Sequence, residues 1–168
     1  MIEEIKIPEQ RKGVLIGANG SVKKKVEKKT RTVLTIDDGI EIEGEALDVL
    51  KAKEIIKAIG RGFAPEKAFK LLGEDYRLVV ISLGRENEKM TKRIFSRIIG
   101  SKGKCRRNIE TLTRTDISVY GKTISIIGKW EDVDKASEAV EMIIEGKMHA
   151  YVYKCIEERE SGGAEGEE

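Results

Sequence analysis

Residues 98–110 read IIGSKGKCRRNIE, and residues 15–27 read LIGANGSVKKKVE, 83 positions earlier. In both stretches, two glycines separated by two residues follow an apolar pair and precede a run of cations. Further identical runs align at shifts of 83 or 84 residues: Thr30-Arg31-Thr32 with Thr113-Arg114-Thr115, and Asp48-Val49 with Asp132-Val133. This self-similarity predicts two copies of one module, each about 70–75 residues long.

Both copies show the same order of periodic segments, β-α-α-β-β-α. Alternating apolar residues predict the strands at 2–7, 33–36 and 40–42, and again at 78–81, 117–119 and 124–126. Helices are expected at 11–16 and 21–29, then at 92–99 and 104–113. The last helix of each copy carries an apolar stripe with helical spacing: Val49, Ala52, Ile56 and Ile59, and Val133, Ala136, Val140 and Ile143. We therefore expect an α+β fold, in which each module has a three-stranded antiparallel sheet with helices on one face.

The domain boundaries follow from this pattern. The first domain is expected at residues 1–62 and the second at 76–156, the latter ending in a long C-terminal helix. Between them, residues 63–75 are expected to form a packed helical connector, in which Pro65 starts a short helix and Phe69 and Leu72 dock. Residues 157–168 carry six acids and one arginine and have little to bury, so we expect a disordered acidic tail.

Positive charge is concentrated around the two glycine pairs. The formal net charge is only +2, but residues 11–31 hold eight Lys or Arg against one acid, and residues 89–114 hold nine against one. Such islands favour a polyanionic partner, because binding releases condensed counterions. No run approaches the roughly 20 apolar residues that span a bilayer, and the first residues lack a signal-peptide pattern. We therefore expect a cytoplasmic protein.

Catalytic and metal chemistry are not expected. Two cysteines and one histidine do not supply an ordinary four-ligand zinc site, and no cofactor is indicated. A nucleotide-binding P-loop needs four residues between its glycines and a Ser or Thr after the lysine, whereas Gly100–Lys104 has two and is followed by Cys105. No base accompanies Cys105, so we interpret it as a small buried side chain rather than a nucleophile. The chain is thus expected not to be an enzyme.

The glycine pairs have a direct physical use. Glycine permits positive φ and close approach of another backbone, and N–H groups at the start of the next helix bind phosphate. The pattern, in this context, indicates a clamp for a nucleic-acid backbone. Apolar side chains on the following strand, Leu34 and Ile36 or Ile117 and Val119, are candidates for contacts with bases, although half of such residues must lie in the core.

With these motifs, the chain resembles a tandem of type I KH domains, in which a GxxG loop holds about four nucleotides. More closely, it resembles the archaeal and eukaryotic KH-protein family of small-subunit ribosome assembly, over residues 1–156, with residues 98–110 and His149-Ala150-Tyr151 most specific. The resemblance implies binding of single-stranded rRNA near the 3′ end of small-subunit rRNA. It also implies two protein partners, the endonuclease that matures this end and, in archaea, the alpha subunit of translation initiation factor two.

The residues expected to bind RNA are Gly17, Ala18, Asn19, Gly20, Lys23, Lys24, Arg97, Gly100, Ser101, Lys102, Gly103, Lys104, Arg106, Arg107, Ile117 and Val119. Typical KH modules have an apolar residue where Lys23 and Arg106 stand, so we expect Val22 and Cys105, one position earlier, to pack instead. The second loop is the more cationic, which predicts that the second module binds RNA more strongly. The alternative is a protein-docking scaffold that contacts assembly or initiation factors through a helix over residues 132–158.

Overall fold

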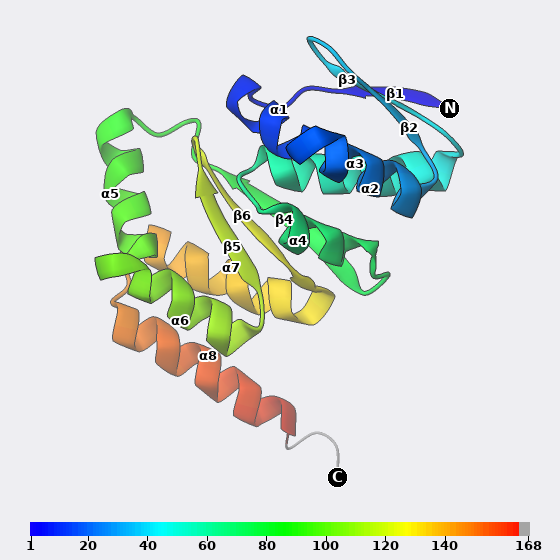
Figure 1. The fold of residues 1–168 in the computed structure, drawn as a ribbon. Helices are drawn as coiled ribbons and strands as arrows, with labels where there is room; N and C mark the ends of the chain where they lie inside the picture. The colour runs from blue at the N-terminus through cyan, green and yellow to red at the C-terminus, as the bar shows by residue number, and fades with distance from the viewer. Residues whose placement is uncertain (165–168) are drawn as a thin grey trace. The chain divides into compact units, whose positions relative to one another are not determined.

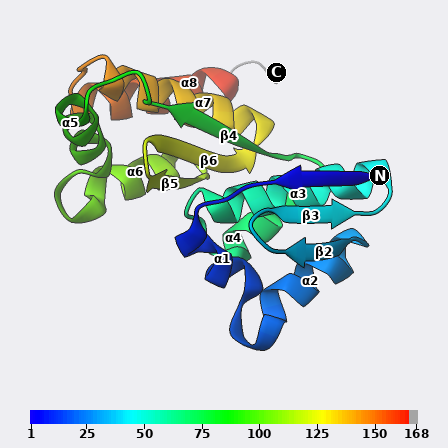
Figure 2. The same cartoon turned by 90° about the horizontal axis from the view of Figure 1, so that it is seen from above.

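The computed structural model describes residues 1–164 and contains two compact units, module 1 (residues 1–78) and module 2 (residues 79–168). Figures 1 and 2 show the elements of each. Module 1 consists of β1 (Ile2–Ile5), α1 (Glu9–Ile16), the short 3₁₀ turn η1 (Ala18–Gly20), α2 (Ser21–Thr30), β2 (Val33–Ile36), β3 (Ile40–Glu43), α3 (Ala46–Gly60), α4 (Pro65–Ala68) and η2 (Phe69–Leu72).

Module 2 repeats this order and adds a helix at its end. It consists of β4 (Tyr76–Ser82, which begins at the module boundary), α5 (Glu88–Ile99), η3 (Ser101–Gly103), α6 (Lys104–Thr113), β5 (Asp116–Tyr120), β6 (Thr123–Lys129), α7 (Trp130–Ile144) and α8 (His149–Ala164). The predicted α+β class and the β-α-α-β-β-α order of each module are confirmed.

The two sheets have the same topology. Their strand orders are β1-β3-β2 and β4-β6-β5. In module 1, Leu34 lies opposite Ile42, and in module 2, Ile117 lies opposite Ile126, in antiparallel pairs. These side chains face the helices and are buried, and the apolar stripes of α3 and α7 are buried against them. Each core therefore lies between one sheet face and the helices, as the periodicity predicts.

The repeated Thr-Arg-Thr segment ends the second helix of each module. In module 2, the Thr113 hydroxyl donates to the Ile109 carbonyl at 2.6 Å and lies 2.8 Å from the Thr115 hydroxyl. Arg114 between them has φ of 57°, a left-handed conformation that stops the helix. The same bonds and angle recur at Thr30, Arg31 and Thr32 in module 1, so the duplicated tripeptide is a helix C-cap.

In each module, a half-buried glutamate on the second helix accepts a hydrogen bond from the strand that follows. Glu27 accepts the backbone N–H of Leu34, and Glu110 accepts that of Ile117, each at 3.0 Å. The acceptor is a side chain because β2 and β5 are edge strands, and these N–H groups face the helix. This bond ties the second helix to the edge strand in both modules.

The prediction of one continuous C-terminal helix over residues 132–158 is wrong, because the structure has two helices there. α7 ends at Ile144 and α8 begins at His149, with Gly146 at φ +98° between them. The Arg97 guanidinium stabilises the break by donating to the carbonyls of Ile143 at 2.8 Å and Lys147 at 2.6 Å. Arg97 belongs to the predicted RNA-binding set, and the structure shows its guanidinium bonded to backbone acceptors at a helix end.

In module 1, an arginine at a different position donates to the carbonyls at the end of α3. Arg11 donates from Nε to the Ile59 carbonyl and from Nη2 to the Phe63 carbonyl, each at 2.8 Å. Ile59 and Phe63 correspond to Ile143 and Lys147 at the shift of 84 residues, whereas Arg11 and Arg97 lie one helical turn apart in the alignment. The function of the arginine is thus repeated although its position is not.

The tail expectation is also corrected, since residues 157–164 continue α8 as a helix. Two ion pairs join this end of α8 to α7: Lys135 Nζ lies 2.8 Å from Glu160 Oε1, and Arg159 pairs with Glu138. The hydrogen bond from Lys135 lowers the pKa of Glu160. Val152 and Ile156 anchor the first part of the helix in the core of module 2. The rest of the expected tail, residues 165–168, lies outside the described residues.

The connector is helical, as expected, with Pro65 as the first residue of α4. Its buried side chains are Phe63, Ala68 and Leu71, so Leu71 rather than Leu72 docks. Phe69 is half-buried, and its ring lies beneath the ammonium of Lys25 on α2, 4.7 Å from the ring centroid. The segment therefore packs on α3 and α2 of module 1.

Replacing Arg97 tests the helix-end assignment. Arg97→Met removes two hydrogen bonds and leaves the carbonyls of Ile143 and Lys147 without this donor. We expect the free energy of unfolding to fall by about 1–3 kcal/mol in urea denaturation. Arg93→Met on the exposed side of α5 is the matched control and should change it by less than about 0.5 kcal/mol. Equal stability of the two variants would contradict the assignment.

Candidate nucleic-acid interface

The two GxxG loops have the same backbone conformation. Gly17 and Gly100 have φ/ψ of 72/175° and 73/179°, and Gly20 and Gly103 have 74/17° and 74/14°. In each loop the N–H of the second glycine donates to the carbonyl of the first at 3.2 Å. The loops therefore have one geometry although their inner residues differ.

The first glycine of each pair is required for packing. A Cβ on Gly17 would lie 2.5 Å from Cγ2 of Val22, and a Cβ on Gly100 would lie 2.7 Å from Cβ of Cys105. Cys105 is buried at 2% exposure, and Val22 is half-buried. These two residues hold the start of α2 or α6 close to the loop, in the packing position expected for them.

The second glycine has a different role. A Cβ on Gly20 would come no closer than 3.9 Å to Lys24, and one on Gly103 would lie 3.2 Å from the flexible end of Arg107. Space is thus available at this position, and positive φ is what requires glycine. The backbone surface is left open for a ligand to approach.

The helices that follow the loops begin without side-chain caps. Gly20 and Gly103 are the N-cap residues of α2 and α6, and neither helix start has a side-chain cap hydrogen bond. The first N–H groups of a helix have no partner within it and favour anions. In each module the first N–H of the helix, that of Ser21 or Lys104, donates to a loop carbonyl, that of Ala18 or Ser101, and no side chain covers the helix start.

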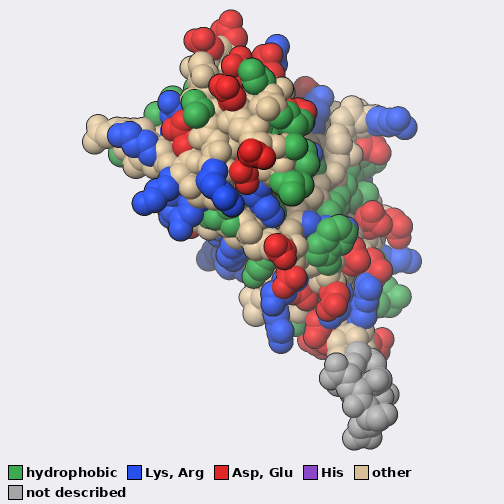
Figure 3. Space-filling view, turned by 90° about the vertical axis from the view of Figure 1, so that its right-hand side faces the viewer, with side chains coloured by type: hydrophobic (Ala, Val, Ile, Leu, Met, Phe, Trp, Pro, Cys, Tyr) green, Lys and Arg blue, Asp and Glu red, His purple; other side chains and the backbone are tan. Residues whose placement is uncertain are grey.

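Cations surround both helix starts, and more of them surround the second. In module 1, Lys24 is exposed and Lys23 half-buried, while the exposed loop residues Ala18 and Asn19 are neutral. Figure 3 shows Lys and Arg side chains gathered on the left part of the face that it draws.

In module 2 the exposed residues are Ser101, Lys102, Lys104 and Arg107. Arg106 is half-buried, and its Nε lies 3.7 Å from Glu110 Oε1. The second loop and the helix start after it therefore expose more positive charge than the first loop itself, whose inner residues are neutral.

The apolar candidates divide into one core residue and one rim residue. Ile117 is 3% exposed and belongs to the hydrophobic core of module 2, so the structure places it in the core and not on an open surface. Ile117 lies opposite Ile126 on the sheet face that the helices cover, and its backbone N–H donates to Glu110 on α6. Val119, two residues further on, is half-buried and lies at the edge of the same core.

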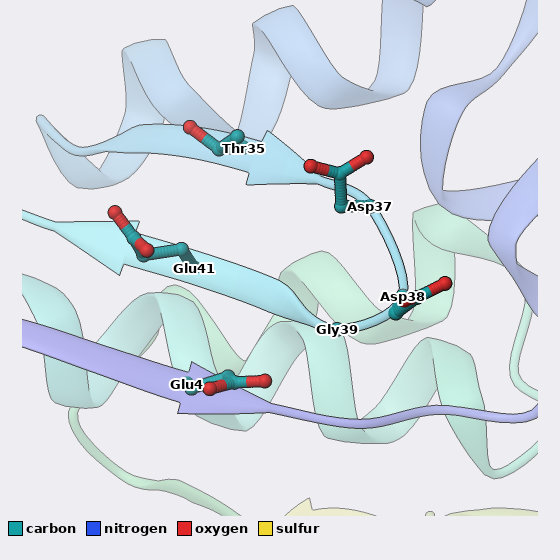
Figure 4. A pocket seen from close by; sticks show the side chains of 6 residues that line it. All are labelled: Glu4, Thr35, Asp37, Asp38, Gly39 and Glu41. Atoms are coloured by element: carbon teal, nitrogen blue, oxygen red, sulfur yellow. The ribbon is translucent and has the colours of Figure 1, made fainter.

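The outer face of the module 1 sheet has the opposite charge. A cavity of about 400 Å³ there is lined by Glu4, Thr35, Asp37, Asp38, Gly39 and Glu41 (Figure 4). Among the described residues, no group of three or more His, Cys, Asp or Glu side chains is arranged to hold a metal ion. A polyanion is repelled from this face, and the helix face of module 1 is left for it.

Three side chains beside the second loop were missed as site residues by sequence reasoning. Asn108 on α6 and His149 and Tyr153 on α8 line a cavity of about 240 Å³ together with the loop. Burial raises the pKa of Tyr153, and the neighbouring side chain of Cys105 raises it further, whereas that of Asn108 lowers it. In the sequence, only the run His149-Ala150-Tyr151, which carries part of the family resemblance, pointed to this region. The packing of α8 on α6 is a tertiary contact that local sequence patterns do not predict.

Burial also raises the pKa of Cys105, although the Tyr153 hydroxyl and the Arg97 charge oppose this effect. A raised pKa keeps the thiol protonated and unreactive at neutral pH. In the described part of the chain, no helix has the length and apolar composition needed to cross a bilayer.

Two family models match the chain. The general KH domain matches residues 2–58, and the eukaryotic-type KH domain of type I, second domain, matches residues 78–161. A KH domain-containing protein of Methanocaldococcus jannaschii is 45% identical over 165 residues, covering 93% of this chain and 73% of that protein.

Solved structures are similar over nearly the whole chain. Dim2p from Pyrococcus horikoshii is 41% identical with a TM-score of 0.87, covering 94% of this chain and 99% of that one. A complex of a/eIF2alpha, aDim2p and rRNA from the same organism gives 40% identity and a TM-score of 0.90, covering 96% and 95%. A protein of unknown function from Aeropyrum pernix gives 39% and 0.91, covering 98% and 94%.

The two glycines of the second loop should respond differently to alanine. Gly100→Ala adds a clash with Cys105 to the cost of a left-handed alanine, so we expect a loss of about 2 kcal/mol or more in the free energy of unfolding. Gly103→Ala pays mainly the conformational cost, about 1 kcal/mol. Thermal and urea denaturation measure both. A larger loss for Gly103→Ala would show that the packing role is misassigned.

Thiol reactivity tests the burial of Cys105. In the native protein we expect iodoacetamide at neutral pH to modify half-exposed Cys155 well before Cys105, because the latter is buried and its pKa is raised. Mass spectrometry of peptides over time measures the two rates. Denatured protein is the control, in which both thiols should react alike. Faster modification of Cys105 in the native protein would contradict its place in the core.

Proposed function

The chain belongs to the family of archaeal tandem KH-domain proteins of ribosome assembly, and from that premise we propose that it binds single-stranded rRNA through its GxxG loops, near the 3′ end of small-subunit rRNA. The observation that carries this proposal is the pair of loops with the same backbone conformation, each leading into a helix start that no side chain caps and that exposed cations flank. KH loops of this kind hold about four backbone nucleotides.

The two modules contribute unequally in this proposal. The module 2 loop has Lys102 within it and Lys104 and Arg107 directly after it, all exposed, whereas the module 1 loop is neutral. Module 2 therefore supplies most of the affinity for phosphates. Module 1 binds RNA with fewer ionic contacts, through the lysines of α2.

The role is binding rather than catalysis, in the cytoplasm, as part of small-subunit rRNA processing. The related aDim2p forms a complex with a/eIF2alpha and rRNA. By this likeness, the chain also binds the alpha subunit of translation initiation factor two, and the endonuclease that matures the 3′ end is a further partner. RNA binding and protein docking then coexist on different surfaces.

Charge reversal at the loop tips tests the RNA clamp. Ser101→Asp with Lys102→Asp places two acids on exposed positions where no core contact is lost. We expect this variant to lose about 100-fold or more in affinity for an oligonucleotide of the rRNA 3′ end, measured by fluorescence anisotropy. Ala18→Asp with Asn19→Asp in module 1 should lose less, about tenfold, because fewer cations surround that loop.

The controls separate clamp from scaffold. Lys129→Asp, an exposed cation away from the loop, should lose less than about threefold. For the unmodified protein, the logarithm of the affinity should fall against the logarithm of salt concentration with a slope of about −3, if four phosphates are contacted. RNA affinity that is unchanged in both loop variants would contradict the clamp. Retained binding of the initiation-factor subunit would then support a scaffold.

A further inference from the structure

A cavity lies beside the module 2 loop, where α8 packs on α6. Its volume is about 240 Å³, and its lining comes from the loop, from α6 and from the first two turns of α8: Gly100, Ser101, Lys104, Cys105, Asn108, His149 and Tyr153. α8 follows the β-α-α-β-β-α unit that the two modules share, so this cavity exists only where the additional helix covers the loop.

The cavity lies on the opposite flank of α6 from the KH groove. Arg106 and Glu110 are directed toward β5, as their ion pair and the bond to the Ile117 N–H show. Lys104 and Asn108 lie on the other flank, toward α8. Gly100 and Ser101 of the loop line the cavity as well, so an RNA backbone held on the loop passes its mouth.

The lining contains polar side chains, one of which has a nitrogen without a hydrogen-bond partner in the described structure. His149 Nε2 has no hydrogen-bond partner within the described residues and is closed to a water-sized probe, so the half-buried imidazole has to turn for a ligand to bond to it. A buried polar atom without a partner costs free energy, and a ligand that bonds to it recovers this cost. The side-chain amide of Asn108, beside Tyr153, and the hydroxyl of Ser101 add donors and acceptors.

Size and shape restrict the ligand. The volume is below the range of about 300–1,000 Å³ that drug-sized molecules occupy, so one planar group fits better than a longer one. The rings of His149 and Tyr153 are tilted by 32° with centroids 6.3 Å apart and form an aromatic wall. Lys104 is the single cation of the lining and is exposed, so a buried phosphate would lack compensation.

Module 1 shows how the same flank looks when it is filled. Lys25 corresponds to Asn108 at the shift of 83 residues, and its ammonium lies over the ring of Phe69. An aromatic residue from the segment after the last shared helix thus covers this helix position in both modules. In module 1 it is paired with a cation, whereas in module 2 Tyr153 is paired with a neutral amide beside a cavity.

We propose that this cavity binds one nucleobase of the strand held by the module 2 loop, with His149 and Asn108 bonding to the edge of the base and Tyr153 packing against it. The inference rests on the proposed RNA clamp and extends it. RNA-binding proteins read unstacked bases by hydrogen bonds to their edges and by aromatic contacts. Module 2 would thus recognise one base outside its groove.

An abasic scan tests the proposal. A series of oligonucleotides of the rRNA 3′ end, each with one nucleoside replaced by an abasic ribose, keeps every phosphate and removes one base. For the unmodified protein, we expect one nucleotide position at which removal of the base weakens binding about tenfold, because that base no longer fills the cavity. This is the size of one lost stacking or hydrogen-bonding contact. In His149→Phe this penalty should fall below about twofold at that position and remain unchanged at all others.

A second variant and a control complete the design. Asn108→Ala should remove the penalty at the same position, and it decides the test if His149→Phe fails to fold. Met148→Ala, a neutral and exposed neighbour, should retain the full penalty. Identical abasic profiles for all proteins would overturn the cavity proposal while leaving the clamp intact. An equal loss at every position in His149→Phe would overturn it too, and absence of oligonucleotide binding by the unmodified protein would reject the clamp itself.

Discussion

The structure of each module depends on the contact between the first glycine of its loop and the second residue of the next helix. With φ near +73° and no Cβ, Gly17 and Gly100 let Val22 and Cys105 approach within van der Waals range of the loop backbone. This contact holds the start of α2 and of α6 against the loop, where Ser21 and Lys104 donate their N–H groups to the carbonyls of Ala18 and Ser101. The anion-binding geometry and the packing of the core are therefore one constraint, and any side chain at this glycine disturbs both.

Around that constraint, the two modules keep the same internal bonds and differ at the surface. The Thr-Arg-Thr cap and the glutamate that holds the edge strand recur with the same partners and nearly the same distances. The loop tips, by contrast, change from neutral to cationic, and the flank of α6 gains α8. Duplication has thus preserved the elements that build the loop, while the residues that meet a ligand have diverged.

Periodicity and the internal repeat were sufficient to predict the modules, their order of elements and the two loops, because each depends on local spacing. The break at Gly146 and the roles of Arg97 and Ile117 were not predictable in this way. Arg97 lies in a basic island, and only the carbonyls of Ile143 and Lys147, some 50 residues away in sequence, show that it caps a helix end. The alternation puts Ile117 and Val119 on one face of β5, but only the packing of the helices shows that Ile117 is covered while Val119 is half-buried. The acidic composition of residues 157–168 predicts a disordered tail. In the structure, ion pairs with α7 hold residues of this segment in the end of α8.

Those ion pairs have a consequence for how the protein responds to its medium. α8 is linked to α7 through four residues around Gly146, and its outer half is held by Lys135–Glu160 and Arg159–Glu138, both at the surface. Exposed pairs of this kind are each worth about 0.2–1 kcal/mol and weaken as ionic strength rises. Electrolyte therefore acts twice on module 2: it screens the loop cations, and it loosens the helix that encloses the loop on its far flank.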